Sequence, residues 1–353
     1  MGTVFSAYRI NQYTTMKRSL LLFLAFFVLN IRVDAQTISS FEKPSKKEFR
    51  KAVATVLYRT DCLSADQEKR QDALSVIQRE INNFSPEDWK DYNTSDSVNE
   101  KEGVPYFYKK ASDKVLKEIK RTKVKRGQVA LWNLYNMGYI VKTPSHTFGI
   151  DLTHKYINLF AQHLDFALVT HIHRDHGDTR DFNAYSDAGV KVYAGHMPRE
   201  KPENLSWTFV EDGETFNFED IRVTCRKTDH NKKKSGQRMV TSFEIDCGKE
   251  TGNTVILHCG DCCNYTQLEV QHKVDFFIFH LSVGLNIQKA IEKIQPEYAV
   301  FSHAWELAHK VDKYRWTIDD LLQTSGKISN FPAERCLLPC WGEKILYTKT
   351  IKE

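Results

Sequence analysis

Apolar positions along the chain follow two different periods. In residues 46–58 and 65–82 they recur at helical spacing, and the sequence Asn-Phe-Ser-Pro at 83–86 interrupts that pattern. From residue 127 onward the pattern changes to short runs rich in β-branched and aromatic residues, which predict strands. The predicted strands are 129–134, 139–142, 147–151, 166–170, 190–194, 221–225, 239–245, 254–258, 274–280 and 299–302, and a helix is predicted at 287–294.

Turn residues and the order of these elements indicate the fold class. A turn is expected at 136–138 and a hairpin turn at Asp212-Gly213. The glycines of 248–252 are expected to join the strands 239–245 and 254–258 as a hairpin. Strand runs come first, and strands alternating with helices follow. That order predicts an α/β fold in which two sheets are covered by helices, preceded by a helical extension.

The first residues are predicted to be a targeting segment. After Met16, Lys17-Arg18 precede an apolar run at 20–29, and small residues follow up to Ala35. This order is typical of a secretory signal peptide, and a run of about ten residues is shorter than the ~20 that a spanning helix needs. We therefore expect cleavage and a secreted or periplasmic protein without stable membrane insertion. An uncleaved anchor and a buried helix are the alternatives.

The chain of 353 residues is thus expected to have three parts, a signal peptide at 1–35, a helical extension at 36–123 and a main domain at 124–353. Removing residues 1–35 lowers the formal net charge from +5 to +2, because four basic residues and one acidic residue are lost. Such a nearly neutral chain is not typical of nucleic-acid-binding proteins. We expect a small-molecule partner and no nucleic acid, and the oligomeric state stays open.

All eight cysteines follow the predicted signal peptide. An oxidising compartment allows disulfides, and Cys336 and Cys340 are close enough in sequence to suggest a pair, although spacing alone does not establish one. Cys259, Cys262 and Cys263 are interpreted as buried residues or disulfide partners, because adjacent cysteines cannot easily share one tetrahedral ion.

The most distinctive chemical pattern is His-Ile-His-Arg-Asp-His at 171–176, directly after the strand predicted at 166–170. Side chains at the end of a strand can converge on one point. Three imidazoles and a carboxylate supply the nitrogen and oxygen donors that Zn²⁺ and similar divalent ions prefer. The pattern predicts a metal site, against the alternative of a histidine-rich solvated loop.

This cluster resembles the signature of the metallo-β-lactamase superfamily, and the rest of that family's pattern follows in order over residues 124–350. The resemblance implies a four-layer αββα sandwich with two divalent ions at one edge between the sheets. Zinc is the expected metal, with manganese and iron as alternatives. The implied ligands are three for each ion and one shared aspartate: His171, His173 and His230; Asp175, His176 and His303; and Asp261.

Three further residues refine this resemblance. Asp151, at the end of the strand 147–151, is similar to the aspartate that orients the family's ligand loop. His173 stands where the flavodiiron branch has glutamate, which disfavours that branch. The short spacing from His230 to Asp261, together with Asp178 after the cluster, resembles the branch of the ascorbate-6-phosphate lactonase and the phospholipase D that cleaves N-acyl phosphatidylethanolamine.

The resemblance implies a hydrolase of ester, lactone, lactam or phosphodiester bonds. In such enzymes two ions about 3.5–4 Å apart activate a shared water and polarise the bond under attack. A metal-dependent nuclease or phosphodiesterase is the alternative within the enzymes. A non-catalytic metal-binding protein of the same fold is the alternative outside them, although every expected ligand position holds a competent residue.

Further residues are assigned roles beside the ligands. Asp175 is expected also to orient the water or take its proton, and Glu306 and His309 are candidate proton donors, with a structural role as the alternative. The loop after His230 is expected to bind an anionic substrate group, against the alternative of a solvated loop. The basic residues of this loop, which covers 231–238, are Lys232, Lys233, Lys234 and Arg238.

The remaining histidines have simpler interpretations. His196, after the strand 190–194, is the rival of His230 as third ligand of the first ion. His258 and His280 lie within or at the end of predicted strands and are interpreted as core residues. Surface or structural roles are the default for the others, His146, His154, His163 and His272.

Overall fold

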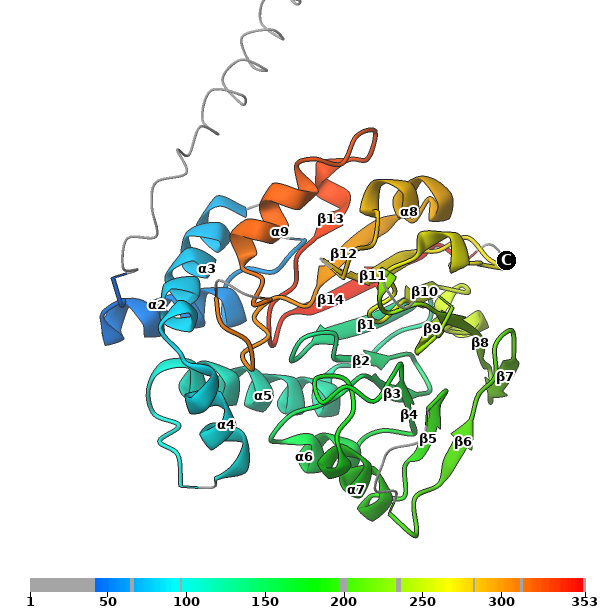
Figure 1. The fold of residues 1–353 in the computed structure, drawn as a ribbon, viewed down its shortest axis with the longest axis horizontal. Coiled ribbons are helices and arrows are strands. Elements are labelled where there is room, and N and C mark those ends of the chain that lie inside the picture. The colour runs from blue at the N-terminus through cyan, green and yellow to red at the C-terminus, as the bar shows by residue number, and fades with distance from the viewer. Residues whose placement is uncertain are drawn as a thin grey trace, which may run out of the picture. The chain divides into compact units, whose positions relative to one another are not determined.

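The computed structural model describes residues 42–63, 67–95, 97–196, 202–232, 236–281, 283–311 and 314–351. The predicted signal peptide at 1–35 lies outside the described residues. Within them, helices come first along the chain, and strands with interspersed helices follow (Figure 1). In this described part, no helix combines the length and apolar character needed to cross a bilayer.

The elements form two seven-stranded sheets and a set of helices. The helices are α2 (Lys46–Tyr58), α3 (Gln67–Asn82), α4 (Pro86–Thr94), α5 (Gly103–Arg121), α6 (Ile157–Ala161), α7 (Thr179–Asp187), α8 (Ile287–Ile294) and α9 (Ile318–Ser325). The first sheet has the order β14 (Lys344–Thr348), β1 (Gln128–Asn133), β2 (Tyr139–Lys142), β3 (Thr147–Ile150), β4 (Phe166–Val169), β5 (Lys191–Ala194) and β6 (Trp207–Phe209). The second has the order β13 (Cys336–Leu337), β12 (Tyr298–Ser302), β11 (Phe276–His280), β10 (Val255–His258), β9 (Val240–Asp246), β8 (Ile221–Thr228) and β7 (Thr215–Phe218).

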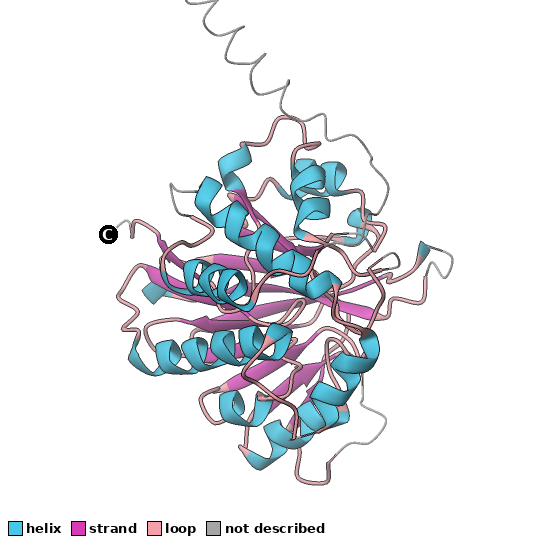
Figure 2. Ribbon diagram, turned by 90° about the vertical axis from the view of Figure 1, so that its left-hand side faces the viewer, coloured by secondary structure: helices cyan, strands magenta, loops and turns pink. Residues whose placement is uncertain are grey.

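Alternating side chains assign the layers. On β1, Val129 and Leu131 belong to the cluster between the sheets, whereas Trp132 belongs to the cluster under the helices. On β11, Ile278 lies between the sheets and Phe279 lies in the cluster that includes residues of α8. Helices cover both outer faces, as Figures 1 and 2 show. The predicted α/β fold with four layers in the order αββα is confirmed.

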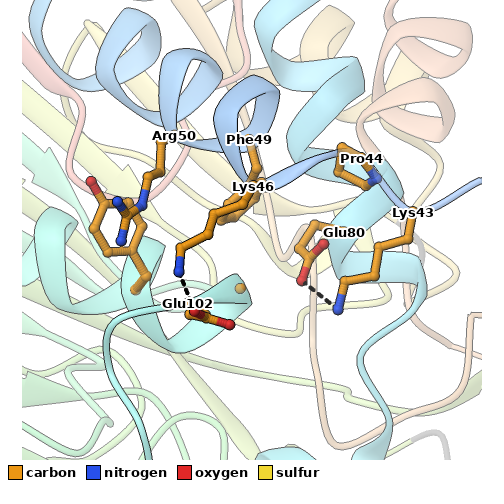
Figure 3. A pocket seen from close by; sticks show the side chains of 9 residues that line it. Lys43, Pro44, Lys46, Phe49, Arg50, Glu80 and Glu102 are labelled. Atoms are coloured by element: carbon orange, nitrogen blue, oxygen red, sulfur yellow. Dashed lines mark hydrogen bonds and ion pairs between the residues drawn. The ribbon is translucent and has the colours of Figure 1, made fainter.

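Helices α2–α5 pack directly on the first sheet. Ile77 of α3 and Phe107 of α5 share one hydrophobic cluster with Trp132 of β1, and residues 43–353 form one compact unit. A buried ion pair joins Arg70 of α3 to Glu343 beside β14, with 2.6 Å between Nη2 and Oε2. Two further ion pairs, Lys43 with Glu80 and Lys46 with Glu102, lie at a small hollow of about 80 Å³ lined by residues of α2, α3 and the start of α5 (Figure 3).

One sequence expectation is confirmed here and another is corrected. The break predicted at 83–86 is present, because α3 ends at Asn82, Ser85 caps the next helix, and Pro86 occupies the first turn of α4, where a missing N–H costs nothing. Asp212-Gly213 is not a hairpin turn, since it lies between β6 of the first sheet and β7 of the second. The β7–β8 hairpin turns at residues 219–220 instead. The expected hairpin of β9 and β10 is confirmed by their antiparallel pairing.

Candidate metal centre

The candidate ligands come from strand ends that meet at one edge. In the second sheet β10, β11 and β12 are mutually parallel, and β8 runs in the same direction because β9 is antiparallel to both β8 and β10. Their carboxyl ends therefore lie together. His230 follows β8, Asp261 follows β10, and His303 follows β12. The segment 171–176 follows β4 of the first sheet.

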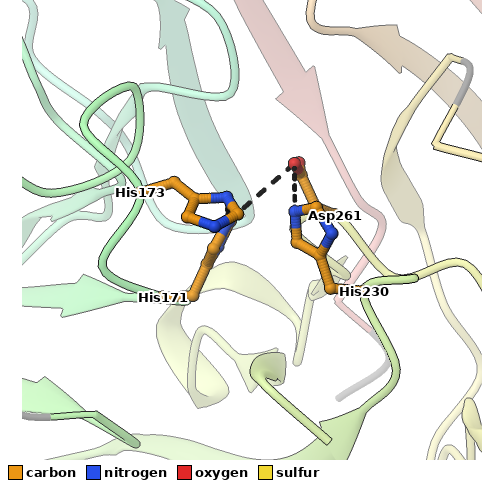
Figure 4. Close-up of side chains that lie close together, drawn as sticks. All are labelled: His171, His173, His230 and Asp261. Atoms are coloured by element: carbon orange, nitrogen blue, oxygen red, sulfur yellow. Dashed lines mark hydrogen bonds and ion pairs between the residues drawn. The ribbon is translucent and has the colours of Figure 1, made fainter. Parts of the chain in front are cut away.

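The first ligand group contains His171, His173, His230 and Asp261, whose ligand atoms all lie within 4.8 Å of one another. Figure 4 shows the three imidazoles and the carboxylate converging. His230 Nε2 is 3.2 Å from Asp261 Oδ2, and His171 Nε2 is 3.8 Å from the same oxygen. This is the set that the resemblance implies for the first ion.

The second group contains Asp175, His176 and His303, again within 4.8 Å of one another. His303 Nε2 is 2.9 Å from Asp175 Oδ2. His176 Nε2 is 3.1 Å from Asp261 Oδ1, the oxygen that does not face His230. The two oxygens of Asp261 therefore point to the two groups, which is the geometry that a bridging carboxylate requires.

Asp151 fixes the orientation of the ligand loop. It is fully buried, and its carboxylate accepts hydrogen bonds from the N–H and the hydroxyl of Thr170, both at 2.7 Å. The other nitrogen of a ligand is held as well, because His176 Nδ1 lies 2.8 Å from Asp151 Oδ2. With Nδ1 as the donor to this carboxylate, Nε2 of His176 is left with a lone pair facing the site.

The buried polar atoms fit divalent ions. His176 Nε2, His230 Nε2, Asp261 Oδ1 and His303 Nδ1 have no hydrogen-bond partner of acceptable geometry among the described residues. Burial lowers the pKa of His171 well below its usual range, and the pKa of His173 is lowered by burial and by His230. Both imidazoles are therefore neutral at ordinary pH, the form that binds a metal. Nitrogen and carboxylate donors in these numbers suit Zn²⁺, Mn²⁺ or Fe²⁺.

The site contains two contacts that the sequence did not reveal. Asn136, expected only as a turn residue, donates from Nδ2 to Asp175 Oδ2 at 3.3 Å. The ring of His280 stacks on that of His303 with centroids 3.8 Å apart, and its ligand atom groups with Asp261 and His303. His280 was interpreted as a core residue because its strand is apolar. Its contact with His303 depends on the position of the neighbouring strand end, which the sequence around His280 does not show.

Glu306 and His309 lie beside this centre. Glu306 Oε1 accepts a hydrogen bond from the hydroxyl of Tyr135 at 3.2 Å, and Glu306 Oε2 is 3.3 Å from His309 Nε2. Burial, and then the nearby charge of Asp175, raises the pKa of the Glu306 carboxyl. Both side chains line a cavity of about 720 Å³ that is also lined by His173 and Asp175.

The other predicted site residues have different surroundings. Lys232 is exposed and Arg238 is paired with Asp212, and neither lines that cavity, whereas Lys233 and Lys234 lie outside the described residues. His196 belongs to neither ligand group. His258 is a core residue as interpreted, with Nε2 2.9 Å from the carbonyl oxygen of Met137. The eight cysteines are free, and none belongs to a ligand group among the described residues.

Comparison with known proteins gives structural likeness only. Neither a protein-family model nor a curated protein sequence matches the chain. A metallo hydrolase of the archaeon Ignicoccus hospitalis is 14% identical with a TM-score of 0.48, over 63% of this chain and 100% of the other. The diiron β-hydroxylase CmlA of Streptomyces venezuelae is 14% identical with a TM-score of 0.48, over 64% and 55%. YhfI of Bacillus subtilis, a metallo-β-lactamase fold protein, is 10% identical with a TM-score of 0.43, over 63% and 100%.

The layers, the strand ends and the ligand groups were assigned from the geometry of this chain. They agree with the fold and the metal site that the metallo-β-lactamase resemblance implies.

Proposed function

We propose that this protein is an exported, metal-dependent hydrolase that holds two divalent ions, with zinc as the metal. It cleaves an ester, lactone, lactam or phosphodiester bond in a small molecule. The observation that carries the proposal is the pair of ligand groups with Asp261 between them, one carboxylate oxygen facing His230 and the other facing His176. Exposed acidic clusters are common without a metal, but His171, His176, Asp261 and His303 are each no more than 5% exposed. Buried, convergent ligands of this kind are costly without an ion.

Two ions in these groups would lower the pKa of a shared water and polarise the substrate oxygen at the reacting bond. The chain's own residues perform the remaining steps. Asp175 borders the cavity and presents a carboxylate that accepts a proton. Glu306, whose raised pKa favours its protonated form, lies beside His309 in the same cavity, and this pair delivers a proton to the leaving group.

The test is the metal content of the purified protein after reconstitution with zinc or manganese. About two equivalents per chain are expected, and Asp261→Ala should lose at least one of them. Asp187→Ala, an exposed aspartate at the end of α7, is the matched control and should keep both. One equivalent or none in the unmutated protein contradicts the dinuclear proposal.

Turnover is then measured with a chromogenic β-lactam, an acyl-homoserine lactone, bis(4-nitrophenyl) phosphate and 4-nitrophenyl esters. Cleavage of one class that disappears in Asp261→Ala supports the hydrolase. Two bound ions without turnover of any of these substrates would favour the non-catalytic alternative.

A further inference from the structure

The large cavity at the metal centre has one wall that belongs to the helical extension. Trp89, Lys90 and Asn93 of α4 line it, opposite His173 and Asp175 of the ligand loop. Its volume of about 720 Å³ lies within the range of small-molecule sites. Helix α4 carries no metal ligand and no sequence motif. The contribution of the helical extension to the cavity could therefore not be predicted from its sequence.

Two side chains that line this cavity each have a buried N–H without a hydrogen-bond acceptor. One is the buried His154, and the other is Arg180, whose side chain is 38% exposed. His154 is 1% exposed, and its Nδ1 accepts a hydrogen bond from the N–H of Tyr156 at 3.0 Å. Burial, and then the charge of Arg180, lowers the pKa of His154 to about 3, so the ring is neutral and carries its proton on Nε2. Neither His154 Nε2 nor Arg180 Nε has a hydrogen-bond partner among the described residues.

Arg180 has two described partners. Its Nη1 donates to the carbonyl oxygen of Asn93 at 3.4 Å, and its Nε forms an ion pair with Asp181 Oδ1 at 3.6 Å, a distance too long for a hydrogen bond. Burial raises the pKa of the Asp181 carboxyl to about 6. The Oδ1 atom of Asn93 is also unpartnered, and an amide turned by 180° would present N–H donors at the same place.

Two more cations stand at the exposed rim of the cavity. Lys90 and Arg174 line it, and neither forms an ion pair with any described residue. Four acidic residues line the cavity as well. Asp175 belongs to a ligand group, Glu306 contacts Tyr135 and His309, and Asp178 caps α7, which leaves Glu87. Lys90 and Arg174 are therefore the cations that could guide an anion toward the buried donors.

We infer that this cavity binds an oxyanion of the substrate, a carboxylate, phosphate or sulfonate group, through His154 and Arg180, with Lys90 and Arg174 guiding it in. The inference rests on the proposed function and names its substrate class, small molecules with an anionic group remote from the reacting bond. Buried donors that gain a charged acceptor form the stronger kind of hydrogen bond. Substrates without the anion leave these donors unpaired and bind less well.

The test compares two esters that differ in one carboxylate, 4-nitrophenyl butyrate and mono-(4-nitrophenyl) glutarate, with the metal-loaded protein. We expect kcat/KM to be about 10- to 100-fold higher for the glutarate ester, mainly through KM. Arg180→Ala should reduce this preference about 10-fold and Lys90→Ala about threefold, and the butyrate ester is measured beside each to correct for any general loss. Equal losses for both esters, or an unchanged preference, would overturn the inference.

Control variants separate charge from general damage. Lys51→Ala on α2 and Arg222→Ala at the start of β8 remove exposed cations away from the cavity and should keep the preference. Arg180→Lys should restore part of it. Lys90 is exposed, so Lys90→Ala tests the inference even where a buried variant fails to fold. Metal content is measured for each variant so that a lost ion is not mistaken for a lost anion site.

A binding measurement distinguishes failure of the inference from failure of the proposed hydrolase. Titration calorimetry of 4-phenylbutyrate into the metal-loaded protein should give a Kd that Arg180→Ala weakens about 10-fold and Arg222→Ala leaves unchanged. Such binding without turnover of either ester would retain the anion site and reject the hydrolase. Turnover with the same Kd in both variants would retain the hydrolase and reject the anion site.

Discussion

Replacing Arg315 by alanine should destabilise the protein and release the loop that carries Glu306 and His309. The Arg315 side chain is 2% exposed and donates to four backbone carbonyl oxygens. Two belong to the loop, Leu307 at 2.8 Å and His309 at 2.7 Å. The other two lie in the last turn of α3 and just after it, with Ile81 at 2.9 Å and Phe84 at 2.6 Å. One guanidinium thus ties the loop to the helical extension.

The magnitude follows from these contacts. Hydrogen bonds with a charged partner contribute about 1.5–3 kcal/mol each, so the four together give an upper bound of about 6–12 kcal/mol. Removing the buried charge also removes its desolvation cost, which is several kcal/mol for one ion. Burial lowers the pKa of Arg315, which is the same cost expressed in another way. The expected loss in the free energy of unfolding is therefore about 3–5 kcal/mol.

Guanidinium-chloride denaturation of Arg315→Ala and the unmutated protein measures this loss. Arg335→Ala, an exposed arginine after α9, is the control and should stay within about 0.5 kcal/mol. Arg315→Lys should lose less than alanine, because it keeps the charge but not the planar fork of donors. A loss below about 1 kcal/mol for alanine would refute the reasoning, since four buried carbonyls would then have found other partners.

Three further changes give expected outcomes. Asp151→Ala should weaken metal binding about 10- to 100-fold in a competition with a chelator, because His176 and Thr170 lose the carboxylate that orients them; unchanged affinity would contradict that role. Gly260→Ala should lower stability and metal content, because the residue has φ of +50° and an added Cβ would lie 2.8 Å from Thr170 Oγ1 and 2.9 Å from Val240 Cγ1; a fully loaded, equally stable variant would be the contrary result. The pKa of His154 is about 3 in the folded protein against 6.5 unfolded, so the folded state binds fewer protons between these values and stability falls as pH falls. Between about pH 6.5 and 4.5 the unmutated protein should lose about 2 kcal/mol more than His154→Gln, as measured by denaturation, and parallel losses would show that His154 is not buried as described.

Much of the fold was predictable because its signals are local. The short apolar runs that were predicted as strands in the main domain correspond to β1–β5 and β8–β12. Residues 287–294 form α8 as expected. The chemistry of 171–176 was equally visible, because one loop carries four donors after one strand. The hairpin turn at Asp212-Gly213 was predicted wrongly because its local signal has two meanings. The same two residues turn the chain between sheets as readily as within a hairpin.

The anion cavity lay beyond sequence reasoning for a physical reason. Metal ligands must converge on a point, so they recur at strand ends, and this regular placement makes them recognisable in the sequence. The residues that line a substrate cavity need only face the same space after the chain has packed, so they follow no fixed spacing in the sequence. His154 has no pattern around it, and its surroundings arise because Tyr108 and Tyr156 pack against its ring while Arg180 comes from α7. The residues next to His154 in the sequence give no sign of these tertiary contacts.

The metal ligands and the residues that line the cavity also differ in the elements that hold them. The ligands stand on strands of two sheets and are held by contacts within the sandwich, such as Asp151 on His176. The opposite wall of the cavity stands on α4, and Arg315 bonds the loop of Glu306 and His309 to the residues just before it. In the proposed site, metal binding depends on the strand ends, and substrate choice depends on α4 together with His154 and Arg180 of the main domain. The helical extension is accordingly a component of the site, and changes in α4 should alter which substrate is accepted while leaving the metal centre intact.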